Sequence, residues 1–294
     1  MSTFIKFISR FSLGFFYGFS SFVLFPMMYY ILKYRRSVVY ANLKNAFPDA
    51  DETSLRAKEK GFYRYLSDLF VETIMSFEIK EKELLSHVTY KNTDVLDKLY
   101  KEGKSVILTL GHIGNYEWMA QGFPLVLPHK CAIAYRKIKN PTFEILFKEA
   151  RGKYGIDLFP TEETGLFLRK NHERPFLLTL ANDQSAPPDN CFWVPFLNQD
   201  TSFFLGTEKI AKKMNLPVVF AHVSVPSRGQ YVLDFELLTD SPQDTADGYI
   251  MNTHAKWLEQ DILKQPEKWL WSHKRWKHKM PEGYSYGFTS KPQA

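Results

Sequence analysis

The chain has 294 residues, of which 45% are hydrophobic and 16% aromatic, and its formal net charge is +6. This length is sufficient for one large α/β domain with a substantial core. Two cysteines, Cys131 and Cys191, are too few for a disulfide-stapled secreted scaffold, and no CxxC spacing predicts a zinc site.

The positive charge is concentrated near the N-terminus. Residues 1–48 contain no acidic residue, and they supply basic side chains at Lys6, Arg10, Lys33, Arg35, Arg36 and Lys44. Because the rest of the chain is balanced, this distribution argues against a nucleic-acid partner and favours anionic lipid headgroups. The aromatic content fits lipid contact, and it fits a phenylalanine-rich core equally well.

Residues 11–32 form an uncharged, mostly apolar run, "FSLGFFYGFSSFVLFPMMYYIL". About 20 such residues suffice for a membrane-spanning helix. A cleaved signal peptide would have a shorter apolar region and a small-residue cleavage site, which this run lacks. Gly14, Gly18 and Pro26 lower the hydrophobicity, so a spanning helix and a helix lying in the interface both remain open. We expect residues 1–36 to anchor the chain in the inner membrane, with the remainder on the cytoplasmic side.

The remaining sequence, residues 37–294, predicts a single α/β domain. Apolar residues at helical spacing predict helices over 38–47 and 51–77. Short apolar runs predict buried strands over 105–111, 131–136, 175–183, 216–225 and 231–238, with helical patterns over 140–153 and 203–214. This alternation predicts a mixed sheet flanked by helices, with ligands bound beyond the carboxyl ends of the strands.

The stretch "GHIGNYEW" follows the first of these predicted strands and contains His112 and Glu117. Residues five apart on one helix point about 140° apart, so a turn is needed to bring the pair together. Asn115 is a plausible N-cap for a helix that begins after such a turn. A histidine oriented by a carboxylate could deprotonate a substrate hydroxyl, since no GxSxG nucleophile motif is present. A purely structural hydrogen bond is the alternative, and the absence of HExxH argues against a metal.

These residues resemble the H-x4-D/E motif of the glycerolipid acyltransferase superfamily, with glutamate at the acidic position as in the late acyltransferases of lipid A biosynthesis. The resemblance covers about residues 10–281 and includes further motifs in the family's order. Those motifs are "RRSVVYANLKNAFP", "AIAYRKIKNP", "ANDQSAPPDNCFWVPFLNQD" and "PEKWLWSHKRWKHKMP". Ser185, Lys274 and Trp276 depart from the commoner family residues, which leaves the acceptor lipid and the acyl chain length open.

The resemblance implies that His112 is the general base and that Glu117 orients it. It also implies substrate-binding roles, which we assign to Arg136, Arg151, Asp183, Asn115, Lys274 and Arg275. Arg151 could bind phosphate or an oxyanion, or be a helix-surface residue. The basic and aromatic residues over 269–277 suit an interface with anionic lipid, and a packed C-terminal segment could look the same.

The activity implied by the resemblance is transfer of a fatty acyl chain to a hydroxyl of a membrane glycolipid of the lipid A type. The donor would be acyl carrier protein, or alternatively acyl-CoA, and no metal or tightly bound cofactor is expected. An acyltransferase acting on a lysophospholipid, an aminoacyl lipid or a mannosyl lipid is the nearest alternative. A lipid hydrolase and a non-catalytic lipid-binding membrane protein are the others.

Overall fold

The computed structural model describes residues 11–170 and 174–288 of the chain. Its centre is a seven-stranded sheet with the order β1-β9-β8-β2-β5-β3-β4. The strands are β1 (Val88–Lys91), β2 (Val106–Leu110), β3 (Lys130–Tyr135), β4 (Asp157–Pro160), β5 (Phe176–Ala181), β8 (Val218–Ser227) and β9 (Gln230–Thr239). Only the β8–β9 pair is antiparallel among these strands. The predicted mixed α/β sheet is therefore confirmed.

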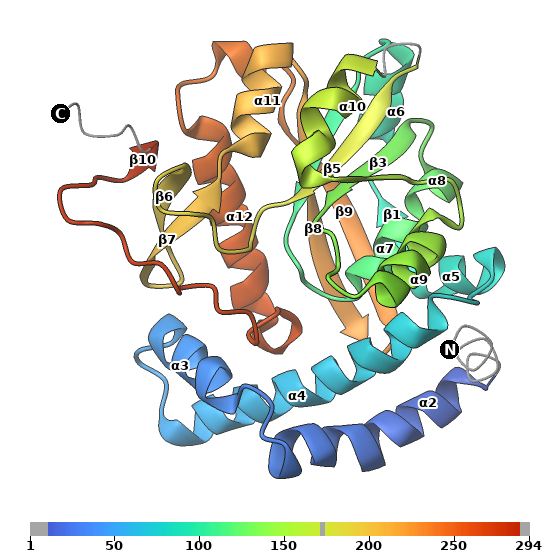
Figure 1. Cartoon of the computed structure of the whole chain (residues 1–294), viewed down its shortest axis with the longest axis vertical. Coiled ribbons are helices and arrows are strands. Elements are labelled where there is room, and N and C mark those ends of the chain that lie inside the picture. The colour runs from blue at the N-terminus through green and yellow to red at the C-terminus, as the bar shows by residue number, and fades with distance from the viewer. Residues whose placement is uncertain (1–10, 171–173, 289–294) are drawn as a thin grey trace.

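A second, antiparallel sheet has the order β10-β6-β7. Its strands are β6 (Cys191–Phe196), β7 (Gln199–Phe204) and β10 (Gly287–Phe288). This small sheet packs against α12 (Tyr249–Lys264), which also contacts β8 and β2 of the large sheet. In Figure 1, α12 and α11 (Gly206–Met214) lie on the left of the large sheet.

Helices on the other side of the sheet include α7 (Tyr116–Gln121), α8 (Phe123–Val126) and α9 (Pro141–Gly152) (Figure 1). The remaining short helices are α5 (Glu81–His87), α6 (Asp94–Lys101) and α10 (Thr164–Lys170), with 3₁₀ turns η3 (Thr161–Glu163), η4 (Pro242–Asp244) and η5 (Pro266–Lys268). The large sheet is thus covered on both faces, which explains why β2 is buried along its whole length.

Residues 13–75 form a layer of helices along one edge of the molecule. α2 (Leu13–Phe19) continues through two π-helical stretches, η1 (Ser20–Leu24) and η2 (Met27–Ile31). α3 (Arg36–Ala46) and α4 (Glu52–Met75) follow, as the sequence predicts. Figure 1 shows α2 and α4 side by side along the lower edge of the molecule.

Leu13–Ile31 is the one helical segment in the described ranges that is long and apolar enough to cross a membrane. Its length and composition support the predicted anchor without distinguishing how it sits in a bilayer. The apolar core is continuous from this segment to the sheet, because Phe16, Leu24 and Tyr29 belong to the same buried cluster as Leu108 and Leu110 of β2.

Candidate active site

His112 lies in a tight turn between β2 and α7. Gly114 has φ +64°, a left-handed backbone conformation that glycine adopts without strain. At Gly111, an added Cβ would lie 2.3 Å from a methyl group of Leu258, so only glycine allows this close approach. Asn115 caps α7 by accepting a hydrogen bond from the backbone N–H of Trp118 at 3.0 Å. The predicted strand–turn–helix arrangement is therefore confirmed.

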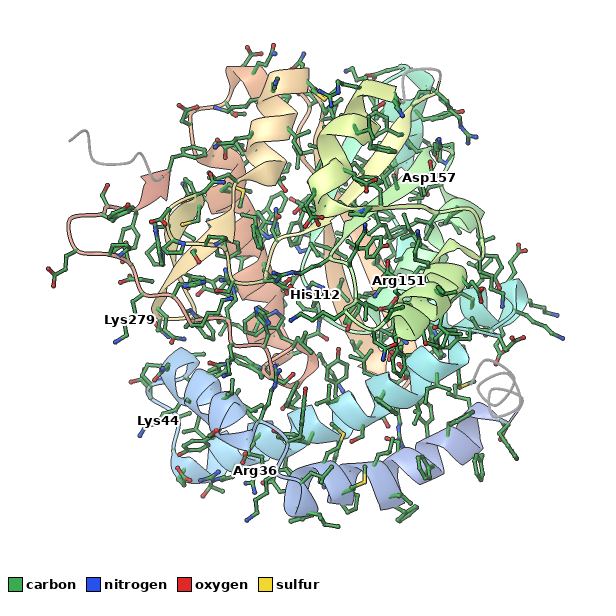
Figure 2. All side chains as sticks on the ribbon, in the orientation of Figure 1. Arg36, Lys44, His112, Arg151, Asp157 and Lys279 are labelled. Carbon is green, nitrogen blue, oxygen red and sulfur yellow. The ribbon has the colours of Figure 1, made fainter. Side chains whose placement is uncertain are left out.

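Two bonds to Asp183 fix His112 in this turn. The Nδ1 atom of His112 lies 2.5 Å from Oδ1 of Asp183, and the His112 backbone N–H donates to Oδ2 at 2.6 Å. Asp183 follows β5, the parallel neighbour of β2, so both groups stand beyond the carboxyl ends of adjacent strands. His112 keeps 17% of its side chain exposed, whereas Asp183 is buried. Figure 2 places His112 at the centre of the molecule, beside the sheet.

The two groups shift each other's protonation equilibria. Burial by itself lowers the pKa of His112, but the charge and hydrogen bond of Asp183 outweigh burial, and the net pKa is raised. Burial likewise raises the pKa of Asp183, and His112 together with two N–H donors lowers it below its usual range. Asp183 is therefore ionised at neutral pH and holds a proton on Nδ1, which leaves Nε2 of His112 as the nitrogen open to a substrate.

The prediction that Glu117 orients His112 through a direct bond is wrong. Glu117 instead forms a bidentate ion pair with Arg151 of α9, with Nε at 2.7 Å and Nη2 at 2.6 Å from its carboxylate oxygens. The first turn of α7 points Glu117 toward α9, while Asp183 already occupies Nδ1 of His112. The Glu117–Arg151 pair is still near enough for both charges to influence the pKa of His112.

Arg151 has one nitrogen, Nη1, that forms no hydrogen bond within the described residues. Its side chain is 23% exposed, and Glu117 raises its pKa against the effect of burial. A guanidinium fixed by a bidentate carboxylate presents its remaining N–H groups in a set direction. Arg151 is thus a fixed cation beside His112 rather than the helix-surface arginine of the alternative interpretation (Figure 2).

Trp269 is a site residue that sequence reasoning did not single out for this role. Its indole N–H donates to Oδ2 of Asp183 at 2.8 Å, and its backbone forms an isolated bridge with Ile113. It therefore holds both the carboxylate and the turn that carries His112. Trp269 lies in the C-terminal motif quoted above. Its partner, Asp183, is distant in sequence, so no local pattern could predict the hydrogen bond between them.

The side chain of Asn115 is engaged within the protein, and its predicted role in substrate binding stays a prediction. The residue is fully buried, and while its carbonyl oxygen caps α7, its amide nitrogen donates to Glu72 of α4 at 2.9 Å. Glu72 also accepts from Tyr231 at 2.5 Å. Burial raises the pKa of Glu72 to about 7, although its three hydrogen-bond donors oppose that shift. Asn115 and Glu72 thus hold the turn in place through buried hydrogen bonds.

The aromatic residues and Arg275 of the C-terminal segment are packed inside the protein. Trp269 and Trp271 are buried, and Arg275 is only 1% exposed. The Arg275 guanidinium lies 4.5 Å from the centroid of the Phe203 ring, and burial lowers its pKa to about 9. Because Arg275 is buried, the packed alternative describes this residue better than the lipid interface does. Lys274 is exposed, as a lipid contact would require.

Arg136 follows β3 and has an exposed side chain. It forms no ion pair with any residue in 11–170 or 174–288, and the structure does not bring it into contact with His112 or Asp183. Its predicted role in substrate binding stays a prediction. The same ranges contain no group of three or more His, Cys, Asp or Glu side chains that could hold a metal ion.

Residues 19–278 match the family model described as bacterial lipid A biosynthesis acyltransferase. A search of curated proteins finds no match to this chain. The matched range includes the turn of His112, Asp183, the Glu117–Arg151 pair and Trp269. The chain therefore belongs to a class of acyltransferases. The chain is a member of the bacterial lipid A biosynthesis acyltransferase family.

Proposed function

We propose that this protein transfers a fatty acyl chain from an acyl thioester on acyl carrier protein to a hydroxyl of a membrane glycolipid, a precursor of lipid A. The observation that carries the proposal is the His112–Asp183 pair, in which one ring nitrogen is bonded to a buried carboxylate and the other is open. The family match supports acyl transfer and a lipid A acceptor. The carrier-protein donor rests on the family resemblance in the sequence.

In the proposed reaction, Nε2 of His112 accepts the proton of the acceptor hydroxyl. The resulting oxygen nucleophile forms a bond to the thioester carbonyl carbon, and a tetrahedral oxyanion develops. Collapse of this intermediate breaks the carbon–sulfur bond, and the thiolate receives the proton from His112. The products are an ester on the glycolipid and the free thiol of the carrier, so no metal or redox group enters the balance.

Each neighbouring residue has a role that follows from its contacts. Asp183 keeps the proton on Nδ1 and stabilises the imidazolium that forms during the reaction. Trp269 holds the Asp183 carboxylate in place. Arg151, fixed by Glu117, supplies a cation for the oxyanion or for a phosphate of the acceptor. Positioning and electrostatic stabilisation of this kind suit a reaction that needs no enzyme nucleophile.

The experiment is an acyl-transfer assay on detergent-purified protein with a panel of acyl carrier protein and CoA thioesters and a total lipid extract. Mass spectrometry identifies any lipid that gains an acyl chain. We expect one glycolipid to gain a chain with the wild type and not with His112→Ala. His278→Ala, which changes a histidine outside the site, is the matched control and should transfer normally.

The outcomes of this assay separate the alternatives. Free fatty acid as the sole product would indicate a hydrolase. Acylation of a lysophospholipid, aminoacyl lipid or mannosyl lipid would keep the mechanism and change the acceptor. No transfer with any donor, or equal transfer by His112→Ala, would contradict the proposed function and favour a lipid-binding protein.

A further inference from the structure

The apolar N-terminal segment has two different faces. Phe15, Phe19 and Phe22 recur at helical spacing on one side and are exposed, with 84% of Phe22 accessible. Phe16 and Ser20 are on the other side and are buried, with exposures of 3% and 1%. Residues three and four apart share a face of a helix, so one face is closed by protein and the other is open.

The buried face is bonded to α4 by polar side chains along its length. Three hydroxyls of the segment donate to three carboxylates of α4 in antiparallel order: Tyr17 to Glu72 at 2.6 Å, Ser20 to Asp68 at 2.5 Å and Tyr29 to Glu59 at 3.3 Å. We call these the hydroxyl–carboxylate pairs. The pairs agree with Figure 1, in which the segment and α4 lie side by side along the lower edge of the molecule. The segment is therefore fastened to the catalytic domain and does not project from it.

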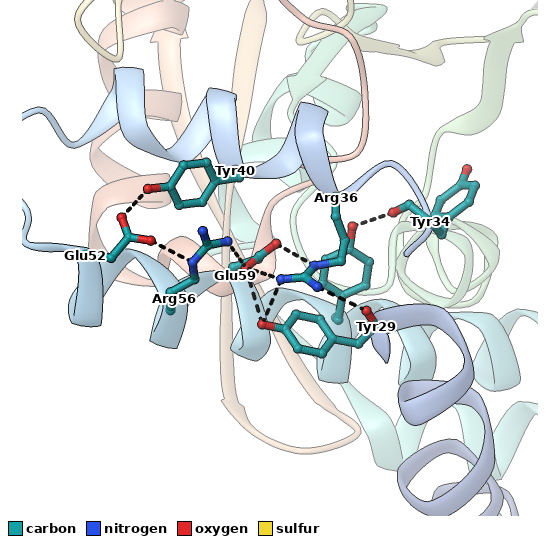
Figure 3. Close-up of polar contacts among 8 residues, drawn as sticks. Tyr29, Tyr34, Arg36, Tyr40, Glu52, Arg56 and Glu59 are labelled. Atoms are coloured by element: carbon teal, nitrogen blue, oxygen red, sulfur yellow. Dashed lines mark hydrogen bonds and ion pairs between the residues drawn. The ribbon is translucent and has the colours of Figure 1, made fainter. Parts of the chain in front are cut away.

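The C-terminal end of the segment is fastened by an ion-pair network (Figure 3). Arg36 pairs with Glu59 at 2.9 Å, and its guanidinium lies 4.1 Å from the centroid of the Tyr29 ring. Arg56 also pairs with Glu59, at 3.0 Å. This network lies where the chain passes from the segment into α3, and it holds the end of the segment against α4.

The sheet contributes a further contact near the start of the segment. Arg228, in the β8–β9 hairpin, donates to the Tyr17 carbonyl oxygen at 3.1 Å and to the Ser21 hydroxyl at 3.0 Å. It also pairs with Asp68 through Nε at 2.8 Å. A charged residue of the catalytic domain is thus in contact with the part of the segment that would lie inside a bilayer if the segment crossed it.

These contacts are incompatible with a segment that crosses the bilayer. Crossing would either carry Asp68, Glu72 and Arg228 into the hydrocarbon or break the pairs and leave buried carboxylates without their donors. A charged side chain at the bilayer centre is energetically costly. α4 cannot accompany the segment, because charged residues recur throughout its length.

We propose that residues 11–34 lie in the plane of the membrane surface, with α4 above them and the exposed aromatic face in the lipid. The open face continues into exposed Tyr30, Ile31 and Leu32, and the exposed basic residues Lys33 and Arg35 follow at its end. Apolar residues on one face with cations at the rim fit an interface that contains anionic lipid. This proposal concerns membrane geometry and does not depend on the proposed acyl transfer.

The test is the side of the membrane on which the N-terminus lies. Both native cysteines are buried, so single reporters can be introduced as Ser2→Cys and, beyond the segment, as the exposed Ser37→Cys. The full chain is labelled with a membrane-impermeant maleimide in sealed inverted and right-side-out vesicles. We expect both reporters to react from the same, cytoplasmic side. Reaction of Ser2→Cys from the opposite face, or protection from both faces, would overturn the proposal.

A second measurement addresses the exposed face. Phe22→Asp should lower the fraction of protein that floats with phosphatidylcholine–phosphatidylglycerol vesicles several-fold, because Phe22 would lie in the lipid. The matched control Leu263→Asp, at an exposed apolar position of α12, should float like the wild type. Unchanged flotation of Phe22→Asp would contradict the proposal. Neither measurement uses acyl transfer, so failure here and failure of the proposed function are distinguishable.

Discussion

His112 and His222 both contact buried carboxylates, yet their surroundings differ in one respect. His222 on β8 has Nδ1 2.9 Å from Asp261 and Nε2 3.1 Å from Glu236, so both ring nitrogens are occupied. Within residues 11–170 and 174–288, the ring of His112 is hydrogen-bonded only through Nδ1, to Asp183. In both residues burial lowers the pKa, but the nearby carboxylates raise it by more, so the net pKa is raised. The availability of the second nitrogen, rather than the carboxylate contact, distinguishes a candidate base from a structural histidine.

The largest expected effect follows from removing the His112 imidazole, whose Nε2 is the proposed general base. His112→Ala should reduce kcat by about 10²–10⁴, the usual contribution of general-base catalysis. His222→Ala should retain near wild-type kcat, because neither nitrogen of His222 is open to substrate. Steady-state acyl transfer measured on both variants tests the comparison. Equal losses in the two variants would show that the distinction between the histidines has no functional meaning.

Replacing the carboxylate of each pair should give the next largest difference. Asp183→Asn should lower kcat by about 10²-fold, since the tautomer and the imidazolium lose their support. It should also shift the acid limb of the kcat/KM profile to lower pH. The base acts when neutral, and Asp183 raises the pKa at which it becomes neutral, so its removal extends activity toward acid. Asp261→Asn should leave the profile where it is, and a shift in that control would contradict the assignment.

The Glu117–Arg151 pair should behave as one unit. Glu117→Gln and Arg151→Gln should each reduce kcat/KM about tenfold or more, because the first releases the cation beside His112 and the second removes it. The double variant should be little worse than either single one. A double-mutant cycle on kcat/KM measures this coupling. Independent, multiplying losses would mean that Glu117 acts on His112 without Arg151.

The smallest expected effect is on stability at His222. Its pKa is raised in the folded protein, so its charged form stabilises the fold below the unfolded pKa, and this contribution is lost as pH rises through the folded pKa. Relative to the wild type, His222→Gln should lose up to about 1 kcal/mol at pH near 6 and much less near pH 9. Denaturant unfolding at the two pH values measures the difference. A loss that is independent of pH would contradict this electrostatic account.

The sequence predicted the fold where hydrophobic patterns were strong. The five apolar runs correspond to β2, β3, β5, β8 and β9, and the helical patterns correspond to α3, α4, α9 and α11. Edge strand β1 and the β6–β7 hairpin were not predicted, because "VTYK" is short and the hairpin includes polar residues and Pro195. α12 was also missed, since its apolar residues are interspersed with polar ones that it buries, such as His254 and Asp261.

The site was predictable only as far as local geometry reaches. The local pattern correctly placed His112 in a turn between β2 and α7 and Asn115 at the N-cap of α7. The partner of His112 depends on which strands are neighbours in the sheet, and β5 beside β2 brings Asp183 within 2.5 Å across 71 residues of sequence. Proximity in sequence favoured Glu117, and sheet order favoured Asp183. The sequence left open whether Arg275 faces lipid or packs inside, because a charge in a basic run is usually solvated and its burial depends on the tertiary fold.

Asp183, and not Glu117, contacts the ring of His112 and is the residue expected to orient it. The most direct test is the pKa of His112, measured by NMR titration of histidine-labelled protein in detergent, for the wild type, Asp183→Asn and Glu117→Gln. We expect Asp183→Asn to lower this pKa clearly and Glu117→Gln to lower it less, because Asp183 contributes both a hydrogen bond and the larger charge effect. A larger decrease in Glu117→Gln than in Asp183→Asn would contradict the account.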